Sequence, residues 1–202
     1  MNRFLYSFII WLGIPFALLK ILLKDSHDPS WKVKLKNQLG FVPKISDRVI
    51  WIHSVSVGEF NASKPLVDNL LDQYPKYKIL LTTTTITGSV AVKNHYKNKI
   101  IHCFFPFDSK LIIKSFLRKI QPEICILMET EIWPNLIHTI NKKNIPVCLI
   151  NARLSEKSFN KYQKFSPKLV SETLRKLTLI CSQNTFSSTR FIKLGANEQS
   201  LI

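Results

Sequence analysis

The sequence predicts an α/β protein, a Rossmann-like parallel sheet preceded by an apolar amino-terminal helix. Three observations lead to this prediction. After residue 46, short apolar runs alternate with amphipathic helical patterns. The runs are apolar at consecutive positions, as in strands that are buried on both faces of a parallel sheet. A separate apolar stretch, long enough to cross a membrane, begins at Phe4.

Composition narrows the class of protein. The 202 residues suffice for one domain of ordinary size but not for two nucleotide-binding domains. A hydrophobic fraction of 46% excludes a disordered chain. The net charge of +16 favours phosphate-rich partners, or simply reflects a lysine-rich solvated surface. Because the lysines are dispersed and no arginine-rich arm occurs, we do not expect a nucleic-acid partner.

Residues 1–24 are predicted to form a membrane-anchor helix. Residues 4–23 carry one charge, Lys20, and as a helix would be roughly 30 Å long, about the thickness of a hydrocarbon core. The alternative is a cleavable signal peptide, but no small-x-small cleavage site follows the stretch. Positive residues are denser after it than before it, which places the remainder on the cytoplasmic side of the membrane.

Residues 25–46 form a basic segment between the anchor and the domain. Residues 31–36 alternate apolar residues with lysine, starting with Trp31. This pattern predicts an interfacial segment that lies on lipid headgroups, with Trp31 at the membrane boundary. The alternative is a polar linker helix without lipid contact.

Residues 47–202 are predicted to form the Rossmann-like domain. Six apolar runs predict its strands, at 49–54, 78–84, 99–105, 124–129, 146–151 and 177–182. Helical patterns lie between them, at 60–73, 109–120, 133–143 and 185–194, the last ended by Gly195. Sheets of this kind bind ligands beyond the carboxyl ends of their strands, so the loops that follow the strands are expected to carry the function.

The loop after the first strand contains Gly58 and Glu59. Gly58 permits either a tight turn or the close approach of a ligand. Glu59 falls in the first turn of the next helix, where a carboxylate can act as a general base on a substrate hydroxyl. The alternative is that Glu59 only complements the helix dipole.

Two carboxylates, Glu129 and Glu131, follow the very apolar fourth strand. Burying charge is costly without partners, so their position is unusual. Helix capping explains Glu131, with Pro134 suited to the first helical positions. Glu129, at the strand tip, is therefore the better candidate for function.

Other strand ends carry weaker signals. Arg153 follows the fifth strand and can hold a phosphate or carboxylate, or pair with one of the two glutamates. Residues 82–89 offer hydroxyls and backbone amides at a helix start. Asp108 is expected to be the N-cap of the helix at 109–120.

Several motifs that bind cofactors or carry out catalysis in other proteins are absent from the sequence. There is no GxGxxG, Walker loop, Asp-x-Asp or Gly-x-Ser-x-Gly, so we expect no nucleotide or metal cofactor. The four cysteines are widely spaced within or beside apolar runs, which predicts neither a metal site nor a disulfide.

Five motifs together resemble the amino-terminal domain of bacterial 3-deoxy-D-manno-octulosonic acid (Kdo) transferases. The apolar amino terminus and the basic residues 31–41 also resemble that family, and the order and spacing match over essentially the whole chain. The motifs are HSVSVGE (53–59), TTTTITGS (82–89), FPFD (105–108), METEIWPN (128–135) and NARLSEKS (151–158).

The resemblance implies a GT-B glycosyltransferase, in which two Rossmann-like domains face a cleft. The amino-terminal domain receives a lipid A precursor (lipid IVA), and the carboxy-terminal domain binds the donor CMP-Kdo. Transfer is inverting and needs no metal or other cofactor. It belongs to lipopolysaccharide core synthesis at the cytoplasmic face of the inner membrane.

The resemblance also implies roles for single residues. Glu59 matches the candidate base, which takes the proton from a primary hydroxyl of the acceptor. Glu129 matches a glutamate that positions the acceptor or the base. Further residues in the matching motifs are expected to bind substrate: Ser56, Gly58, Thr84 and Arg153.

The sequence departs from the family pattern at its carboxyl end, near where the family's interdomain connection begins. We therefore expect it to supply the acceptor-binding half, with the donor domain absent. Asn37 and Gln38 also stand where charged residues are expected. The alternative function is that of a catalytically inactive, membrane-anchored remnant that binds anionic lipid.

Overall fold

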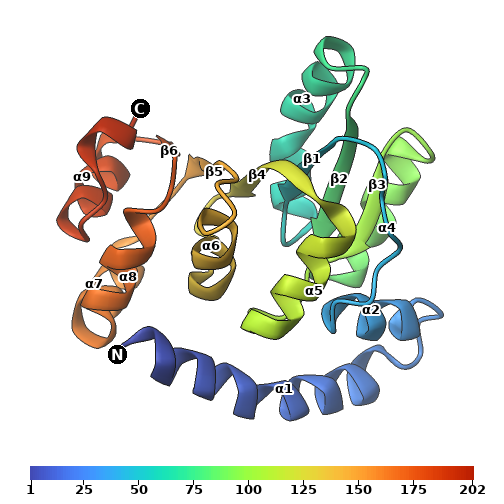
Figure 1. The fold of residues 1–202 in the computed structure, drawn as a ribbon, viewed down its shortest axis with the longest axis horizontal. Coiled ribbons are helices and arrows are strands. Elements are labelled where there is room, and N and C mark those ends of the chain that lie inside the picture. Colours follow the sequence, from blue (N-terminus) through green and yellow to red (C-terminus); the bar gives the residue numbers. More distant parts are fainter.

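The computed structural model describes residues 1–202 as a six-stranded parallel sheet with helices on both faces (Figure 1). The strands lie in the order β3-β2-β1-β4-β5-β6. They are β1 (Val49–His53), β2 (Lys78–Thr83), β3 (Ile101–Phe104), β4 (Pro122–Met128), β5 (Val147–Ala152) and β6 (Leu179–Ser182). All six predicted runs overlap these strands, which confirms the predicted α/β class.

The helices include the four predicted in the domain and three that were not, α4, α7 and α8. They are α1 (Arg3–Asp25), α2 (Trp31–Gln38), α3 (Val57–Gln73), α4 (Ile86–Tyr96), α5 (Lys110–Ile120), α6 (Pro134–Asn141), α7 (Glu156–Phe165), α8 (Pro167–Leu174) and α9 (Thr185–Lys193), with a short 3₁₀ turn at Glu198–Ser200.

Of these three, only α4 lacks a clear apolar periodicity, while α7 and α8 are short amphipathic helices. The buried face of α4 begins with Gly88 and Ser89, small residues that let the helix approach the sheet closely. A Cβ on Gly88 would meet the side chain of Thr83 at 3.4 Å. Helix α7 buries no residue at all, and α8 has only eight residues.

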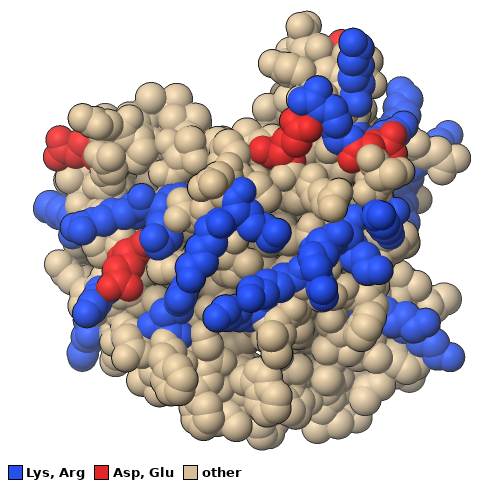
Figure 2. Space-filling model, in the orientation of Figure 1, with Lys and Arg blue, Asp and Glu red and all other residues tan.

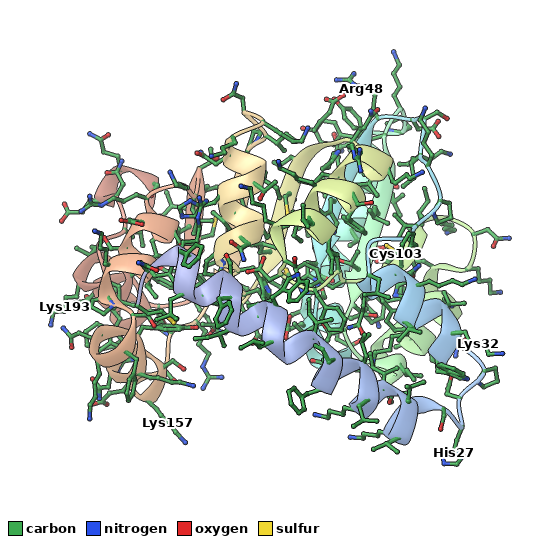
Figure 3. All side chains as sticks on the ribbon, turned by 60° about the horizontal axis from the view of Figure 1, so that its bottom comes forward. His27, Lys32, Arg48, Cys103, Lys157 and Lys193 are labelled. Carbon is green, nitrogen blue, oxygen red and sulfur yellow. The ribbon has the colours of Figure 1, made fainter.

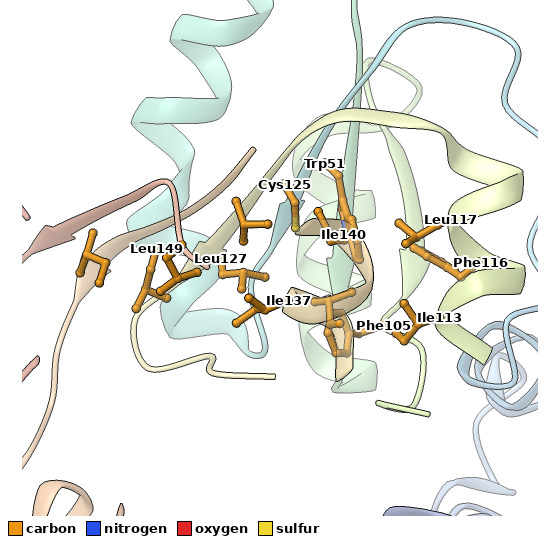
Figure 4. Packing of buried hydrophobic residues seen from close by; sticks show 14 of the residues in the cluster. Trp51, Phe105, Ile113, Phe116, Leu117, Cys125, Leu127, Ile137, Ile140 and Leu149 are labelled. Atoms are coloured by element: carbon orange, nitrogen blue, oxygen red, sulfur yellow. The ribbon is translucent and has the colours of Figure 1, made fainter. Parts of the chain in front are cut away.

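The core has two parts, one on each face of the sheet. The larger part joins the sheet to α5, α6, α8 and α9, and the smaller joins it to α3 and α4. Trp51 of β1 is fully buried in the larger part, with its ring 5.1 Å from Phe116 of α5 (Figure 4). Its indole N–H donates to Thr82 Oγ1 on β2, so the one polar atom of this side chain is satisfied.

Helix α1 lies along the domain rather than projecting from it (Figures 1 and 3). It is long and apolar enough to cross a membrane, by length and composition. The hydroxyl of Tyr6 donates to Asp108, which follows β3, and that of Ser7 to Asn135, which follows β4. Helix α1 therefore runs across the carboxyl edge of the sheet, and most of its apolar side chains point away from the domain.

The role predicted for Asp108 is wrong. Ser109 occupies the N-cap position of α5, while the carboxylate of Asp108 accepts the backbone N–H groups of Asn135 and Leu136 at the start of α6. Asp108 thus caps a helix that begins more than twenty residues later in the chain. Burial raises the pKa of Asp108 to about 6.

Helix α2 packs against β3 with one face buried. Lys34 on this face pairs with Asp25 of α1 at 2.8 Å. Asn37 accepts the backbone N–H of Phe104, and Gln38 is also buried. Both amides are thus buried, where a charged side chain would need a partner. The outer face of α2 is exposed, and its contact with lipid headgroups stays a prediction.

Candidate active site

Glu59 lies in the first turn of α3, just beyond the carboxyl end of β1. Its Oε2 atom accepts the backbone N–H of Val55 at 2.8 Å, which holds the carboxylate over the loop between strand and helix. Its Oε1 atom has no hydrogen-bond partner in the protein, and the residue is partly exposed. The side chain is therefore positioned, yet open to a ligand.

Burial raises the pKa of Glu59 to about 7, helped by the nearby negative charges of Glu131 and Glu129. The hydrogen bond from Val55 acts in the opposite direction. A carboxyl group with this pKa is substantially ionised at neutral pH and is still basic enough to take a proton from a hydroxyl in a transition state. The structure thus brings together the three carboxylates that the sequence places on two different loops.

Glu129 adopts a left-handed backbone conformation at the tip of β4, with φ of 55°. Asn151, at the tip of the neighbouring strand β5, does the same with φ of 51°. Such conformations are unfavourable for residues other than glycine and persist where the surrounding structure imposes them. Here the backbone N–H of Glu129 donates to the carbonyl of Ile150 on β5. The strand tip therefore holds Glu129 in a fixed direction.

Glu131 does not cap α6, contrary to the prediction. Its Oε2 atom accepts the indole N–H of Trp133 at 2.7 Å and lies 3.6 Å from Nε2 of His53. The His53 ring is fully buried and stacks on Phe105. Its Nδ1 atom forms a hydrogen bond with Oγ1 of Thr82. His53 is not among the residues predicted to be functional, although a histidine at the end of an apolar strand is an available signal.

Three of the predicted substrate-binding residues lie around Glu59. Ser56 occupies the N-cap position of α3, but its hydroxyl makes no capping hydrogen bond. The backbone N–H of Thr84 donates to the carbonyl of Val55, and its Oγ1 atom is buried without a partner. Gly58 has a negative φ, so it is not required for a tight turn; a Cβ there would meet only Ser56 Oγ, at 3.9 Å.

Arg153 follows β5 and is exposed. It forms no ion pair with either Glu129 or Glu131, so the structural bridge considered from sequence is not present. The backbone carbonyl of Arg153 accepts the hydroxyl of Thr130, which ties its loop to the one that carries Glu129. Its guanidinium is left free for a ligand.

No group of three or more His, Cys, Asp or Glu side chains is placed to hold a metal ion. All four cysteines are unpaired. Burial raises the pKa of each of their thiols, most strongly for Cys103 and Cys125 in the core.

Comparison with known proteins identifies relatives of this chain. A relative from Haemophilus influenzae, a 3-deoxy-D-manno-octulosonic acid transferase, is 37% identical over 205 residues, covering 100% of this chain and 48% of the relative. A probable mitochondrial transferase of the same name from Arabidopsis thaliana is 39% identical over 151 residues, covering 73% of this chain and 33% of that protein. The chain thus spans about half the length of the first relative and about a third of the second.

Among solved structures, the UDP-GlcNAc 2-epimerase from Neisseria meningitidis is similar, with a TM-score of 0.54 and 15% identity. The match covers 77% of this chain and 46% of the epimerase, and at this identity it bears on the fold alone. A family model described as 3-deoxy-D-manno-octulosonic-acid transferase matches residues 33–202. The chain therefore belongs to the Kdo transferase family of glycosyltransferases, of which it matches the amino-terminal part.

Proposed function

We propose that this chain is the acceptor-binding half of an enzyme that transfers Kdo from CMP-Kdo to lipid IVA, a lipid A precursor, in lipopolysaccharide core synthesis. The single observation that carries the proposal is Glu59, a positioned carboxylate with a free oxygen and a pKa of about 7 at the carboxyl edge of the sheet. CMP-Kdo binds the donor domain of the full-length enzyme, opposite this edge.

In the proposed reaction, Glu59 takes the proton from a primary hydroxyl of the acceptor. The oxygen of that hydroxyl forms a bond to the anomeric carbon of Kdo, with inversion and without a metal. The bond from this carbon to the CMP phosphate oxygen breaks, and CMP leaves with the bonding electrons. Glu129 positions the acceptor or Glu59, and Ser56, Gly58, Thr84 and Arg153 contact substrate.

A bilayer surface is the proposed location, at the cytoplasmic face of the inner membrane. Helix α1 exposes large apolar side chains on the side away from the domain, with Phe4 83% and Phe16 75% exposed. Above α1, Lys and Arg side chains form a band across one face, which suits anionic headgroups (Figure 2). Basic side chains also line two neighbouring clefts that share Arg3 and Lys142; the others are Lys110, Lys114, Lys143, Arg175 and Lys176.

The catalytic role is tested by pairing the chain with the carboxy-terminal half of a full-length relative and measuring Kdo transfer to lipid IVA. Glu59→Gln should lower kcat by about 100-fold or more, as expected for loss of a general base. The matched control is Glu156→Gln, because Glu156 also lies in the first turn of a helix. Equal activity of the two variants would contradict the assignment of Glu59 and favour the dipole role.

The membrane location has its own test. Replacing both Phe4 and Phe16 by glutamate should abolish sedimentation of the chain with anionic vesicles without unfolding it, since both side chains are exposed. Phe186→Glu, on α9 and 74% exposed in the wild type, is the control and should sediment normally. Vesicle binding without transfer in the paired enzyme would instead support the inactive, lipid-binding remnant.

A further inference from the structure

A cleft of about 440 Å³ lies between the second half of α1, α2 and the start of α4. The side chains that give it chemical character are Lys20, Lys24, Lys34, Gln38, Thr84 and Thr87. These residues come from three separate segments of the chain: α1, α2 and the stretch from the end of β2 into α4. The mechanism above uses only one of them, Thr84.

The charge in this cleft is positive. Lys34 is neutralised by Asp25, which also lines the cleft. Lys20 and Lys24, one turn apart on α1, form no ion pair. Two uncompensated cations at one cleft favour an anionic ligand.

The start of α4 adds oriented donors to the same cleft. Thr85 caps the helix by accepting the N–H of Gly88. The N–H groups of Ile86 and Thr87 have no acceptor in the protein, and both residues line the cleft. Such free donors, together with the positive end of the helix dipole, bind phosphate readily.

Two unsatisfied buried atoms point to a ligand independently of the helix end. Gln38 is only 5% exposed, and its Oε1 atom has no hydrogen-bond partner. The Oγ1 atom of Thr84 is likewise buried and unpartnered. Leaving buried polar atoms unsatisfied is costly. The Thr84 hydroxyl can donate a hydrogen bond to a phosphate oxygen, whereas Oε1 of Gln38 can only accept one and suits a hydroxyl group of the same ligand.

We infer that this cleft binds the phosphate group of a phosphorylated lipid acceptor. The inference rests on the proposed function and deepens it. The backbone N–H of Thr84 donates to the carbonyl of Val55, and the N–H of Val55 donates to the carboxylate of Glu59. Val55 alone therefore separates Thr84, which lines the cleft, from the candidate base. The outer face of α1 is apolar, so acyl chains of the same lipid can enter the bilayer beside the lysines.

The test measures binding of the chain to phosphatidylcholine vesicles that contain a bisphosphorylated glucosamine disaccharide lipid or its dephosphorylated form. The wild type should prefer the phosphorylated lipid. Replacing both Lys20 and Lys24 by glutamine should reduce that preference about tenfold, as expected for lost contacts to a charged group. Replacing Lys157 and Lys161 by glutamine removes the same charge from two exposed positions one turn apart on α7, outside this cleft, and should retain the preference.

Thr84→Val provides a variant whose folding is not at risk, because the hydroxyl that it removes has no partner. It should remain as stable as the wild type and lose affinity only for the phosphorylated lipid. An equal loss of preference in the two double-lysine variants, or normal binding by Thr84→Val, would overturn the assignment. Inorganic phosphate that binds as tightly as the phosphorylated lipid would identify a free-phosphate site and overturn the lipid assignment.

Failure of this site and failure of the proposed function give different results. If the paired enzyme transfers Kdo and the Lys20/Lys24 variant keeps the wild-type KM for the acceptor, the cleft assignment is wrong and the function stands. If the cleft binds phosphorylated lipid as described but the paired wild-type enzyme transfers no Kdo, the function is wrong and the site stands.

Discussion

In the wild type, the backbone N–H of Val55 donates to Oε2 of Glu59 at 2.8 Å. Replacing Glu59 by glutamine removes the ionisable group but keeps an oxygen that can accept this hydrogen bond. Burial and the neighbouring carboxylates raise the pKa of Glu59 from its ordinary value of 4.5 to about 7 in the folded protein. The folded state therefore binds this proton more tightly than the unfolded state. Ionisation of Glu59 consequently destabilises the fold, and the loss of stability develops as the pH rises from 4.5 through 7.

The size of this effect follows from the two pKa values. If none of it is screened, the difference between a pKa of about 7 in the folded protein and 4.5 in the unfolded chain corresponds to ~3 kcal/mol in the free energy of unfolding. Because the side chain is partly exposed, solvent screening reduces it, and we expect ~1 kcal/mol. Glu59→Gln should therefore unfold about 2–4 °C above the wild type at pH 8, and at nearly the same temperature as the wild type at pH 4.5.

Two measurements check this prediction in the detergent-solubilised chain. Thermal unfolding followed by circular dichroism at the two pH values gives the difference in stability. Carbon-13 NMR of labelled glutamate carboxyl groups should give one titration near pH 7 that is lost in Glu59→Gln and retained in Glu156→Gln. A Glu59 carboxyl that titrates near 4.5, or an unfolding difference that is the same at both pH values, would refute the reasoning.

The remaining predictions concern stability and are checked by urea denaturation. Gly58→Ala should stabilise the protein by about 0.5–1 kcal/mol, because the position is helical and a Cβ there would meet only Ser56 Oγ, at 3.9 Å; a loss of stability would contradict the absence of crowding at this position. Gly195→Ala should destabilise it by about 1–3 kcal/mol, since φ is 92° and the new Cβ would lie 2.3 Å from Ser171 Oγ; a neutral effect would contradict that crowding. Asp108→Ala should cost about 2 kcal/mol through loss of the α6 cap, with unchanged stability excluding that role.

Much of the fold is predictable because strands and helices leave local patterns. The continuous apolar runs predict all six strands, since a strand covered on both faces needs apolar residues at consecutive positions. Helix α4 leaves no such pattern, because its contact with the sheet depends on the small residues Gly88 and Ser89. The identity of the family follows from motifs at the strand ends, and Glu59 is found at the place that its motif predicts.

The site itself is only partly predictable. Glu131 has a plausible local role as a helix cap, so its contact with Trp133 and its approach to His53 could not be read from spacing. Asp108 has an equally plausible local role at α5, yet it caps α6. In both cases the partner that prevails depends on which loops the sheet brings to the same edge.

By itself, the sequence determined the α/β class, the strand order along the chain, the family and the candidate base, since these depend on local periodicity and on short motifs. Only the tertiary structure decided that α1 runs across the carboxyl edge of the sheet, and that Lys20 of α1 and Thr84 after β2 line one cleft. It also decided that Glu129 and Glu131 raise the pKa of Glu59. The physical reason is that charge, burial and hydrogen bonding depend on distances in space between residues that are far apart in the chain.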